Sequence, residues 1–109
     1  MLTESAFIAA ADGTLATIGL ALDAALETGN ADVDWNLNDG ILEIECEDGS
    51  KLIVNRHVPN REIWVAARSG GFHFGAREDG WRDTRSGEEL FASLAGIIES
   101  QAGVRVDWK

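Results

Sequence analysis

Carboxylates are the side chains in this sequence whose spacing most clearly suggests a ligand. Polar and apolar residues alternate from Asp32 to Glu47, with Asp39-Gly40 between the two halves. An Asp-Gly pair in this setting is typical of a tight β-hairpin. The acidic residues then face one another as Asp34 with Glu45 and Asp32 with Glu47, and Asn36 faces Glu43. Opposed like charges destabilise a sheet, so hydration, the nearby Lys51 or a bound cation has to relieve them.

A second group of carboxylates lies in a segment that the sequence predicts to be helical. At about 100° per residue, Asp12, Asp23 and Glu27 fall on one flank of its apolar stripe. A helix packed beside the first strand would extend this strip toward Asp32 and Asp34. Oxygen ligands suit hard cations such as Ca²⁺, Mg²⁺, Mn²⁺ and iron. With no His or Cys nearby, such a site would be weak, poorly selective and exposed, and the alternative is a merely solvated face.

Trp64 is the residue that most resembles part of a protein interface. It alternates with Ile63 and Val65, which favours an outward Trp64 beside Glu62 and on the same face as Asn55. An exposed Trp among hydrogen-bonding groups is typical of an interface hot spot. The alternative is the opposite phase, with Trp64 in the core.

The remaining reactive residue types do not form a catalytic pattern. His57 and His73 are expected to be ordinary surface residues, and Cys46 alternates into the core with Leu42 and Ile44. A buried structural thiol is inert. The sequence offers no nucleophile paired with a base, so we expect no enzyme.

Composition narrows the classes of partner. The 109 residues carry a net charge of −10, which repels nucleic acid and anionic lipid and favours cations and basic protein surfaces. The apolar runs are too short to span a bilayer, so no membrane partner is expected. The first residues carry no Lys or Arg, unlike a secretory signal, and one cysteine cannot form an internal disulfide. A cytoplasmic location is the expectation.

Hydrophobic periodicity divides the chain into a helix, a set of strands and a second helix. The first helix is expected from about Thr3 to about Thr28, and the second begins at Ser86, as N-cap, with a Glu three residues on. Hairpin signals between them predict five or six antiparallel strands. The fold class is therefore α+β, a two-layer sandwich with the N- and C-terminal helices on one face of the sheet. Residues 1–109 form a single domain whose tail, Val104–Lys109, docks onto the body.

The central segment, Gly49–Phe74, is GSKLIVNRHVPNREIWVAARSGGFHF, and Gly80-Trp81 is followed by the run DTRSGE from Asp83. The G-S-K start, the Asn-Arg pair, the Pro, the I-W-V-A core and the S-G-G-aromatic-H-F end resemble the frataxin family in its bacterial form. The order of helix, meander and helix is similar too. The resemblance covers nearly the whole chain.

This resemblance implies an iron-binding protein that modulates iron–sulfur cluster assembly. It implies weak Fe²⁺ or Fe³⁺ binding, with other divalent cations also accepted, on an acidic ridge formed by Asp12, Asp23, Glu27, Asp32 and Asp34. Glu45, on the second strand, is added to these expected metal ligands from its own position in the sequence. It also implies docking on the cysteine desulfurase and on scaffold proteins through Asn55, Arg56 and Trp64. The expected state is a monomer that metal could drive into oligomers.

The sequence also departs from the family pattern. Gly19, Leu20, Ala24 and Ala25 stand late in the first helix, where bacterial frataxins usually have a dense run of acids. Glu43 and Glu45 on the second strand could shift the negative centre onto the sheet. A metal-independent acidic module that regulates the desulfurase is the alternative function.

Overall fold

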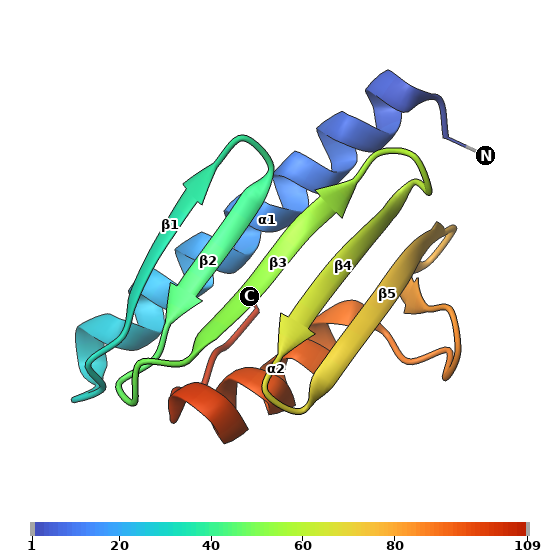
Figure 1. Ribbon diagram of the computed structural model, residues 1–109. Helices are drawn as coiled ribbons and strands as arrows, with labels where there is room; N and C mark the ends of the chain where they lie inside the picture. The colour runs from blue at the N-terminus through green and yellow to red at the C-terminus, as the bar shows by residue number, and fades with distance from the viewer. Residues whose placement is uncertain (1, 109) are drawn as a thin grey trace.

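The computed structural model describes residues 2–108, so Met1 and Lys109, the ends of the predicted domain and tail, lie outside the described residues. A six-stranded antiparallel sheet is flanked in sequence by two helices, and both helices lie behind the sheet in Figure 1. The elements are α1 (Glu4–Thr28), β1 (Asp34–Asn38), β2 (Ile41–Glu45), β3 (Lys51–His57), β4 (Glu62–Ala67), β5 (Gly70–Arg77), β6 (Gly80–Asp83) and α2 (Leu90–Ala102). The predicted fold class is confirmed.

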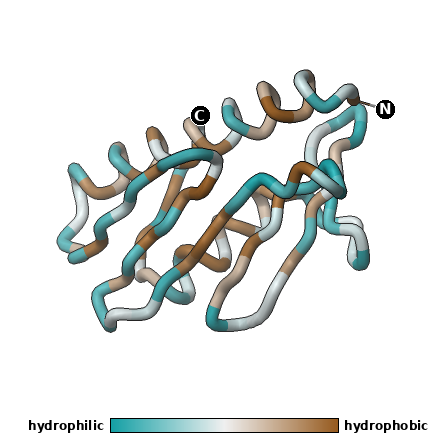
Figure 2. The backbone as a smooth tube through the Cα atoms, turned by 45° about the horizontal axis from the view of Figure 1, so that its top comes forward, coloured by the Kyte–Doolittle hydropathy of each residue, from teal (hydrophilic) through white to brown (hydrophobic). Residues whose placement is uncertain are grey.

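The strands follow one another across the sheet in the order of the sequence. Each hairpin pairs in the register that its turn dictates, and Asn36 faces Glu43 and Asp34 faces Glu45 as predicted. The β1–β2 ladder ends at Asp34, so Asp32 has no strand partner in Glu47. Apolar and polar segments succeed one another along the strands (Figure 2), which gives the sheet one face for the core and one open face.

Helix α1 begins at its Thr3 N-cap, whose hydroxyl accepts the backbone N–H of Ala6 at 3.1 Å. Its apolar stripe is completely buried against the sheet over four turns, at Phe7, Ala11, Leu15, Ile18 and Leu22. By length and composition alone this helix could cross a membrane. The burial of its stripe against the strands accounts for the same hydropathy, because the core helix of a two-layer fold needs such a face.

Helix α2 begins at Leu90, not at Ser86 as the sequence suggested. Its N-cap is Glu89, whose carboxylate accepts the backbone N–H groups of Phe91 and Ala92 at 3.0 and 3.1 Å. Ser86 is held one turn earlier, where its N–H donates to the Asp83 carboxylate at 3.1 Å. A short polar side chain that bonds the backbone two or three residues on competes with helix initiation, and here Asp83 forms that turn.

The core lies between the helices and the sheet, where Phe7, Phe74 and Leu94 are fully buried. The tail closes this core, as predicted. Val104 is buried, and the indole N–H of Trp108 donates to the carbonyl of Phe91 at 2.9 Å. The two rings pack with centroids 5.0 Å apart.

Candidate binding surfaces

The acidic residues gather in the first part of the chain. Residues 1–50 contain eleven Asp and Glu and no Lys or Arg, whereas residues 51–109 contain eight Asp and Glu and nine Lys and Arg. The formal charges of the two parts are therefore −11 and +1. We refer to the described residues 2–50, which form α1, β1 and β2, as the acidic half.

Asp12 is not a free member of the predicted ridge. Its carboxylate binds the Arg56 guanidinium at 2.5 Å, and Asp39 lies 3.5 Å from the same group. The guanidinium also lies over Gly40, where a Cβ would come within 2.5 Å of it. Because only 20% of the Arg56 side chain is exposed, this cation is a fixed part of the structure. It ties the middle of α1 to the β1–β2 turn.

Asp23 also has a structural partner. Its carboxylate accepts the indole N–H of Trp35 at 2.9 Å, and the Trp35 ring lies against α1 at Gly19. A Cβ at Gly19 would come within 2.6 Å of this ring. Gly19, which departs from the family pattern, is therefore the residue that lets β1 approach the helix so closely.

Lys51 places a positive charge beside the acids of the second strand. Its ammonium lies 2.6 Å from the Glu43 carboxylate, and Lys51 faces Glu45 across β2 and β3. The hydrogen bond that Lys51 donates to Glu43, together with the charges of Glu43 and Glu45, raises the pKa of Lys51. Hydration, Lys51 and a bound cation were the three explanations for the like-charged pair Asp34–Glu45. A compensating cation, Lys51, is present, although it contacts Glu43 and not the pair itself.

The other predicted metal ligands are exposed, and none of them forms an ion pair with a described Lys or Arg. Within residues 2–108, no Lys or Arg lies within 4 Å of the carboxylates of Glu27, Asp32, Asp34 or Glu45. Nor does any group of three His, Cys, Asp or Glu in the described chain come together closely enough to hold a metal. The acidic half therefore presents separate carboxylates and no preformed metal site among the described residues.

The open face of the sheet carries the second candidate surface. Asn55 and Trp64 are direct neighbours across β3 and β4, so the predicted outward phase of Trp64 is correct. Arg56 is not part of this face. It faces the buried Ile63 and reaches α1 on the other side of the sheet, because successive residues of a strand point to opposite faces. The predicted contact of Asn55, Arg56 and Trp64 is therefore split between two faces.

Both faces of the Trp64 ring are covered by histidines. The His57 ring is stacked on one side with centroids 3.6 Å apart and planes inclined by 9°. The His73 ring is stacked on the other side at 4.2 Å and 10°. We call these three residues the ring stack. The Trp64 indole N–H donates to the Glu62 carboxylate at 2.8 Å, which fixes the plane of the central ring.

The prediction that the two histidines are surface residues holds for His73, which is exposed although it is stacked on Trp64, and is wrong for His57. His57 is half-buried, and its Nδ1 is buried without a hydrogen-bond partner. The sequence did contain a signal for the contact between His73 and Trp64, in the β4–β5 turn. This hairpin pairs Ala67 with Gly70, and the same register brings His73 opposite Trp64.

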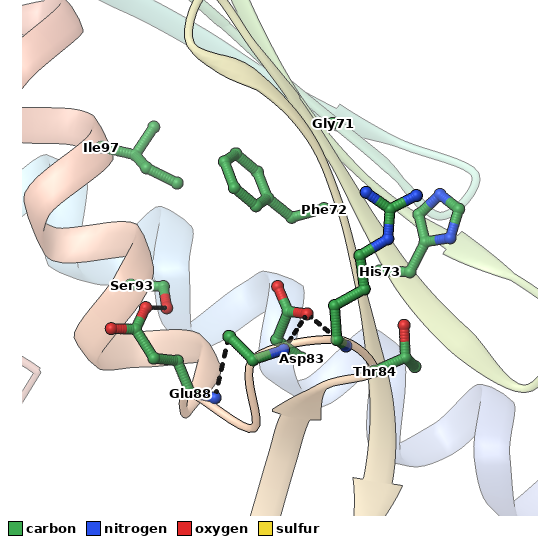
Figure 3. Close-up of a pocket in the computed structure, with 10 residues that line it drawn as sticks. Gly71, Phe72, His73, Asp83, Thr84, Glu88, Ser93 and Ile97 are labelled. Atoms are coloured by element: carbon green, nitrogen blue, oxygen red, sulfur yellow. Dashed lines mark hydrogen bonds between the residues drawn. The ribbon is translucent and has the colours of Figure 1, made fainter.

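A groove adjoins the ring stack at His73 (Figure 3). It is a cavity of about 480 Å³ between β5, α2 and the segment that joins β6 to α2. Phe72 and Ile97 supply its apolar wall. Its acids are engaged internally, because Asp83 accepts the N–H groups of Arg85 and Ser86, and Glu88 accepts the hydroxyl of Ser93. This groove carries no catalytic arrangement.

Comparison with known proteins agrees with these features. Residues 1–104 match the family model described as a frataxin-like domain. The chain belongs to the frataxin-like family. It is 48% identical over 110 residues to the iron-sulfur cluster assembly protein CyaY of Cupriavidus metallidurans, covering 99% of this chain and 97% of that protein. It is 41% identical over 105 residues to the protein of the same name from Burkholderia mallei, covering 96% of each.

Solved frataxins share the whole architecture. Frataxin from Psychromonas ingrahamii superposes with a TM-score of 0.88 at 32% identity, covering 99% of both chains. Trimeric frataxin from Saccharomyces cerevisiae, solved in complex with ferrous iron, shares the fold with a TM-score of 0.73 at 24% identity, over 94% of this chain and 88% of that one. The resemblance inferred from Gly49–Phe74 is therefore confirmed for the family and for the fold.

Proposed function

We propose that this protein takes part in iron–sulfur cluster assembly in the cytoplasm, as an iron-binding regulator that docks on the cysteine desulfurase. Membership of the frataxin-like family and the name shared by its curated relatives support the assembly role. The observation that carries the proposal is the division of charge, because all of the net negative charge belongs to the acidic half. A surface of one sign attracts cations and steers a basic protein surface toward it.

Iron in this proposal is a cargo that the carboxylates hold loosely. Asp12 is neutralised by Arg56 and Asp23 is bound to Trp35, so the available ligands are the exposed carboxylates at the end of α1 and on β1 and β2. They are Glu27, Asp32, Asp34 and Glu45. Because they do not converge, each ion would have few protein ligands and would keep much of its water. Binding of this kind is weak and accepts several hard cations.

A metal-independent interaction module is the second candidate. The observation that favours it is the absence, within residues 2–108, of three converging metal ligands. The same carboxylates would then serve only to attract a basic partner. In both cases the protein regulates the chemistry of another protein and performs none of its own.

The first test is an anaerobic titration with Fe(II), followed by amide NMR, with Mg²⁺ as a control for charge. We expect selective broadening at Glu27, Asp32 and Asp34. The double variant Asp32→Asn with Asp34→Asn should weaken binding several-fold and leave the fold intact. The matched control, Asp79→Asn with Glu99→Gln, makes the same change of charge on exposed residues outside the acidic half. Equal iron affinity in the two double variants would exclude the acidic half as the iron site.

The second test measures docking on the desulfurase as a function of salt. Exposed charges separated by more than about 8 Å are screened at physiological ionic strength. We therefore expect the association rate to fall steeply with added salt, and to fall further in the Asp32→Asn, Asp34→Asn variant than in its matched control. An association rate that does not depend on salt would remove the electrostatic docking proposal.

A further inference from the structure

We infer that the groove between β5 and α2 binds the N-terminus of another protein, as an added strand on β5 whose first residue is apolar and whose α-amino group is free. The inference goes beyond the proposed function and does not depend on it. It rests on an unpaired stretch of β5, on the place where that stretch ends, and on the charges and apolar side chains that line the groove.

The first half of β5 has a strand on one side only. Gly70–His73 pairs with β4, but the pairs with β6 begin at Phe74. The backbone N–H of Thr84 donates to the carbonyl of His73 at 2.9 Å, which extends the ladder by one bond. Backbone groups of alternate strand residues point to the same side, so Gly71 directs its N–H and C=O into the groove. Within residues 2–108, no backbone group bonds Gly71 from that side. Such an unpaired edge accepts a further strand.

The segment after β6 leaves β5 because it is held in a turn of its own. The Asp83 carboxylate accepts the backbone N–H groups of Arg85 and Ser86 at 2.7 and 3.1 Å. The N–H of Gly87 donates to the carbonyl of Asp83 at 2.9 Å. These bonds turn the chain away from β5 directly after Thr84. The groove is therefore closed at its Thr84 end, and a strand added to β5 has to begin there.

A strand that continues the direction of β6 would begin at this closed end with its own N-terminus. Its first residue would lie opposite Phe72, and its second would exchange two backbone hydrogen bonds with Gly71. Directly opposed residues share a face of the sheet, so the first side chain would lie beside Phe72, on the side of Ile97 in α2. These two side chains form the apolar wall of the cavity and point toward one another in Figure 3. An apolar first residue is therefore complementary to the groove.

The charges of the groove favour a free α-amino group at the closed end. Asp83, Glu88 and Arg85 give the lining a formal charge of −1, with His73 neutral. One oxygen of Asp83 accepts the N–H groups of the turn, and one oxygen of Glu88 accepts the Ser93 hydroxyl at 2.8 Å. Within residues 2–108, the second oxygen of each carboxylate has no hydrogen-bond or ion-pair partner. These two oxygens can accept an ammonium group.

Neighbouring charges outside the lining are engaged in pairs or in a cap, so they leave this balance unchanged. They are Arg68 with Asp48, Arg82 with Asp79, and Glu89, which caps α2. Arg85 forms no ion pair in the part of the chain that the structure describes. Its guanidinium is therefore available to bond a carbonyl oxygen of the added strand.

The first experiment titrates the unmodified protein with the tetrapeptide amide Leu-Thr-Val-Thr, followed by amide NMR. We expect saturable shifts at Gly71, Phe72, Glu88 and Ile97, and slower hydrogen exchange of the Gly71 N–H. The charge control is acetyl-Leu-Thr-Val-Lys-amide, which carries the same net charge at its other end. It should bind about three- to tenfold more weakly, because it lacks the charge-assisted contact at the closed end. Absence of saturable shifts, equal affinity for the two peptides, or shifts centred outside the groove would overturn the inference.

The second experiment locates the α-amino group by mutation. Glu88→Gln keeps an oxygen for the Ser93 hydroxyl but removes one charge, so it should weaken binding of the free-amine peptide about three- to fivefold. Binding of the acetylated peptide should not change. Glu99→Gln makes the same change of charge on an exposed residue of α2 outside the groove and is the matched control. If both variants weaken binding alike, the peptide responds only to the net charge of the protein and the inference fails. Concentration-dependent shifts of the groove residues without peptide would show that a second copy supplies the N-terminus, and would overturn the choice of another protein.

Discussion

The acidic half and the open face of β3–β5 both offer partners a polar surface, but their side chains are held in different ways. Most carboxylates of the acidic half are exposed and do not converge, although Asp12 is bound to Arg56 and Asp23 to Trp35. Glu43 and Asp48 also have partners, in Lys51 and Arg68. On the open face the three rings touch, and a hydrogen bond to Glu62 orients the central one. The acidic half would therefore attract a ligand through the number of its charges. The open face would instead bind through the shape of its fixed side chains.

This difference has consequences for mutation. A field made by eleven acids changes little when one is removed, and salt screens it. A stack of three rings loses its arrangement when the central ring is removed, and salt has little influence on it. We therefore expect single substitutions to be mild in the acidic half and severe in the ring stack.

The largest effect should come from Trp64→Ala. It removes two ring contacts, each contributing about 0.5–1.5 kcal/mol beyond burial, and the half-buried indole itself. We expect the free energy of unfolding, measured by urea denaturation, to fall by about 2–3 kcal/mol. The control is Asp34→Asn in the acidic half, which should change it by less than about 0.5 kcal/mol. Equal losses in the two variants would show that the contrast between the surfaces is wrong.

The next effect concerns a fixed contact between the acidic half and β3. Arg56→Gln removes the cation that holds Asp12 on α1 and reaches Asp39 in the β1–β2 turn. We expect a loss of about 1–2 kcal/mol in the free energy of unfolding, because this charge-assisted contact is mostly shielded from water. Arg105→Gln, whose partner pair is exposed, is the matched control and should cost close to nothing. A similar melting temperature for both variants would count against a structural role of Arg56.

The fold follows from sequence patterns that act over short distances. The stripe of α1 and the alternation of the strands predict which side chains are buried, and each turn sets the register of its hairpin. Asp39-Gly40 placed Asp34 opposite Glu45 correctly for this reason. The sheet could be assembled strand by strand because its order is that of the chain.

The site was less predictable because it depends on contacts across several elements. Arg56 and Asp12 are 44 residues apart, and no local pattern relates them. The ring stack requires the registers of two consecutive hairpins at once. The placement of Arg56 beside Asn55 came from the family resemblance and overlooked strand parity, which sends neighbouring residues to opposite faces.

Lys51→Gln should strengthen cation binding by the acidic half, because it removes the positive charge that lies beside Glu43. This substitution removes the ammonium beside Glu43 and opposite Glu45. The hydrogen bond to Glu43 and the charges of both acids raise the pKa of Lys51, so it is protonated at neutral pH. We expect the affinity of this corner for Mn²⁺ to rise about two- to fivefold, as measured by paramagnetic broadening of the Glu43 and Glu45 amides. Arg105→Gln changes the net charge equally at a distance and serves as the control. If both variants bind Mn²⁺ alike, only the total charge matters and Lys51 has no local effect.

The smallest effect is expected at Asp48, where the acidic half meets the rest of the sheet. Its carboxylate accepts the hydroxyl and the N–H of Ser50 at 2.7 and 2.9 Å and contacts the Arg68 guanidinium at 2.8 Å. These bonds, those from Ser50 above all, lower the pKa of Asp48 below 3.8. Because the folded state holds the charged form, this contribution to stability is present above pH 3.8 and is lost as pH falls through the lowered value. Asp48→Asn should therefore lower the melting temperature slightly at neutral pH, and the gap from the unmodified protein should narrow in acid. A difference in melting temperature that stays constant from pH 7 to pH 2.5 would mean that the charge of Asp48 does not contribute to stability. Asp48 would then act only through the shape of its side chain.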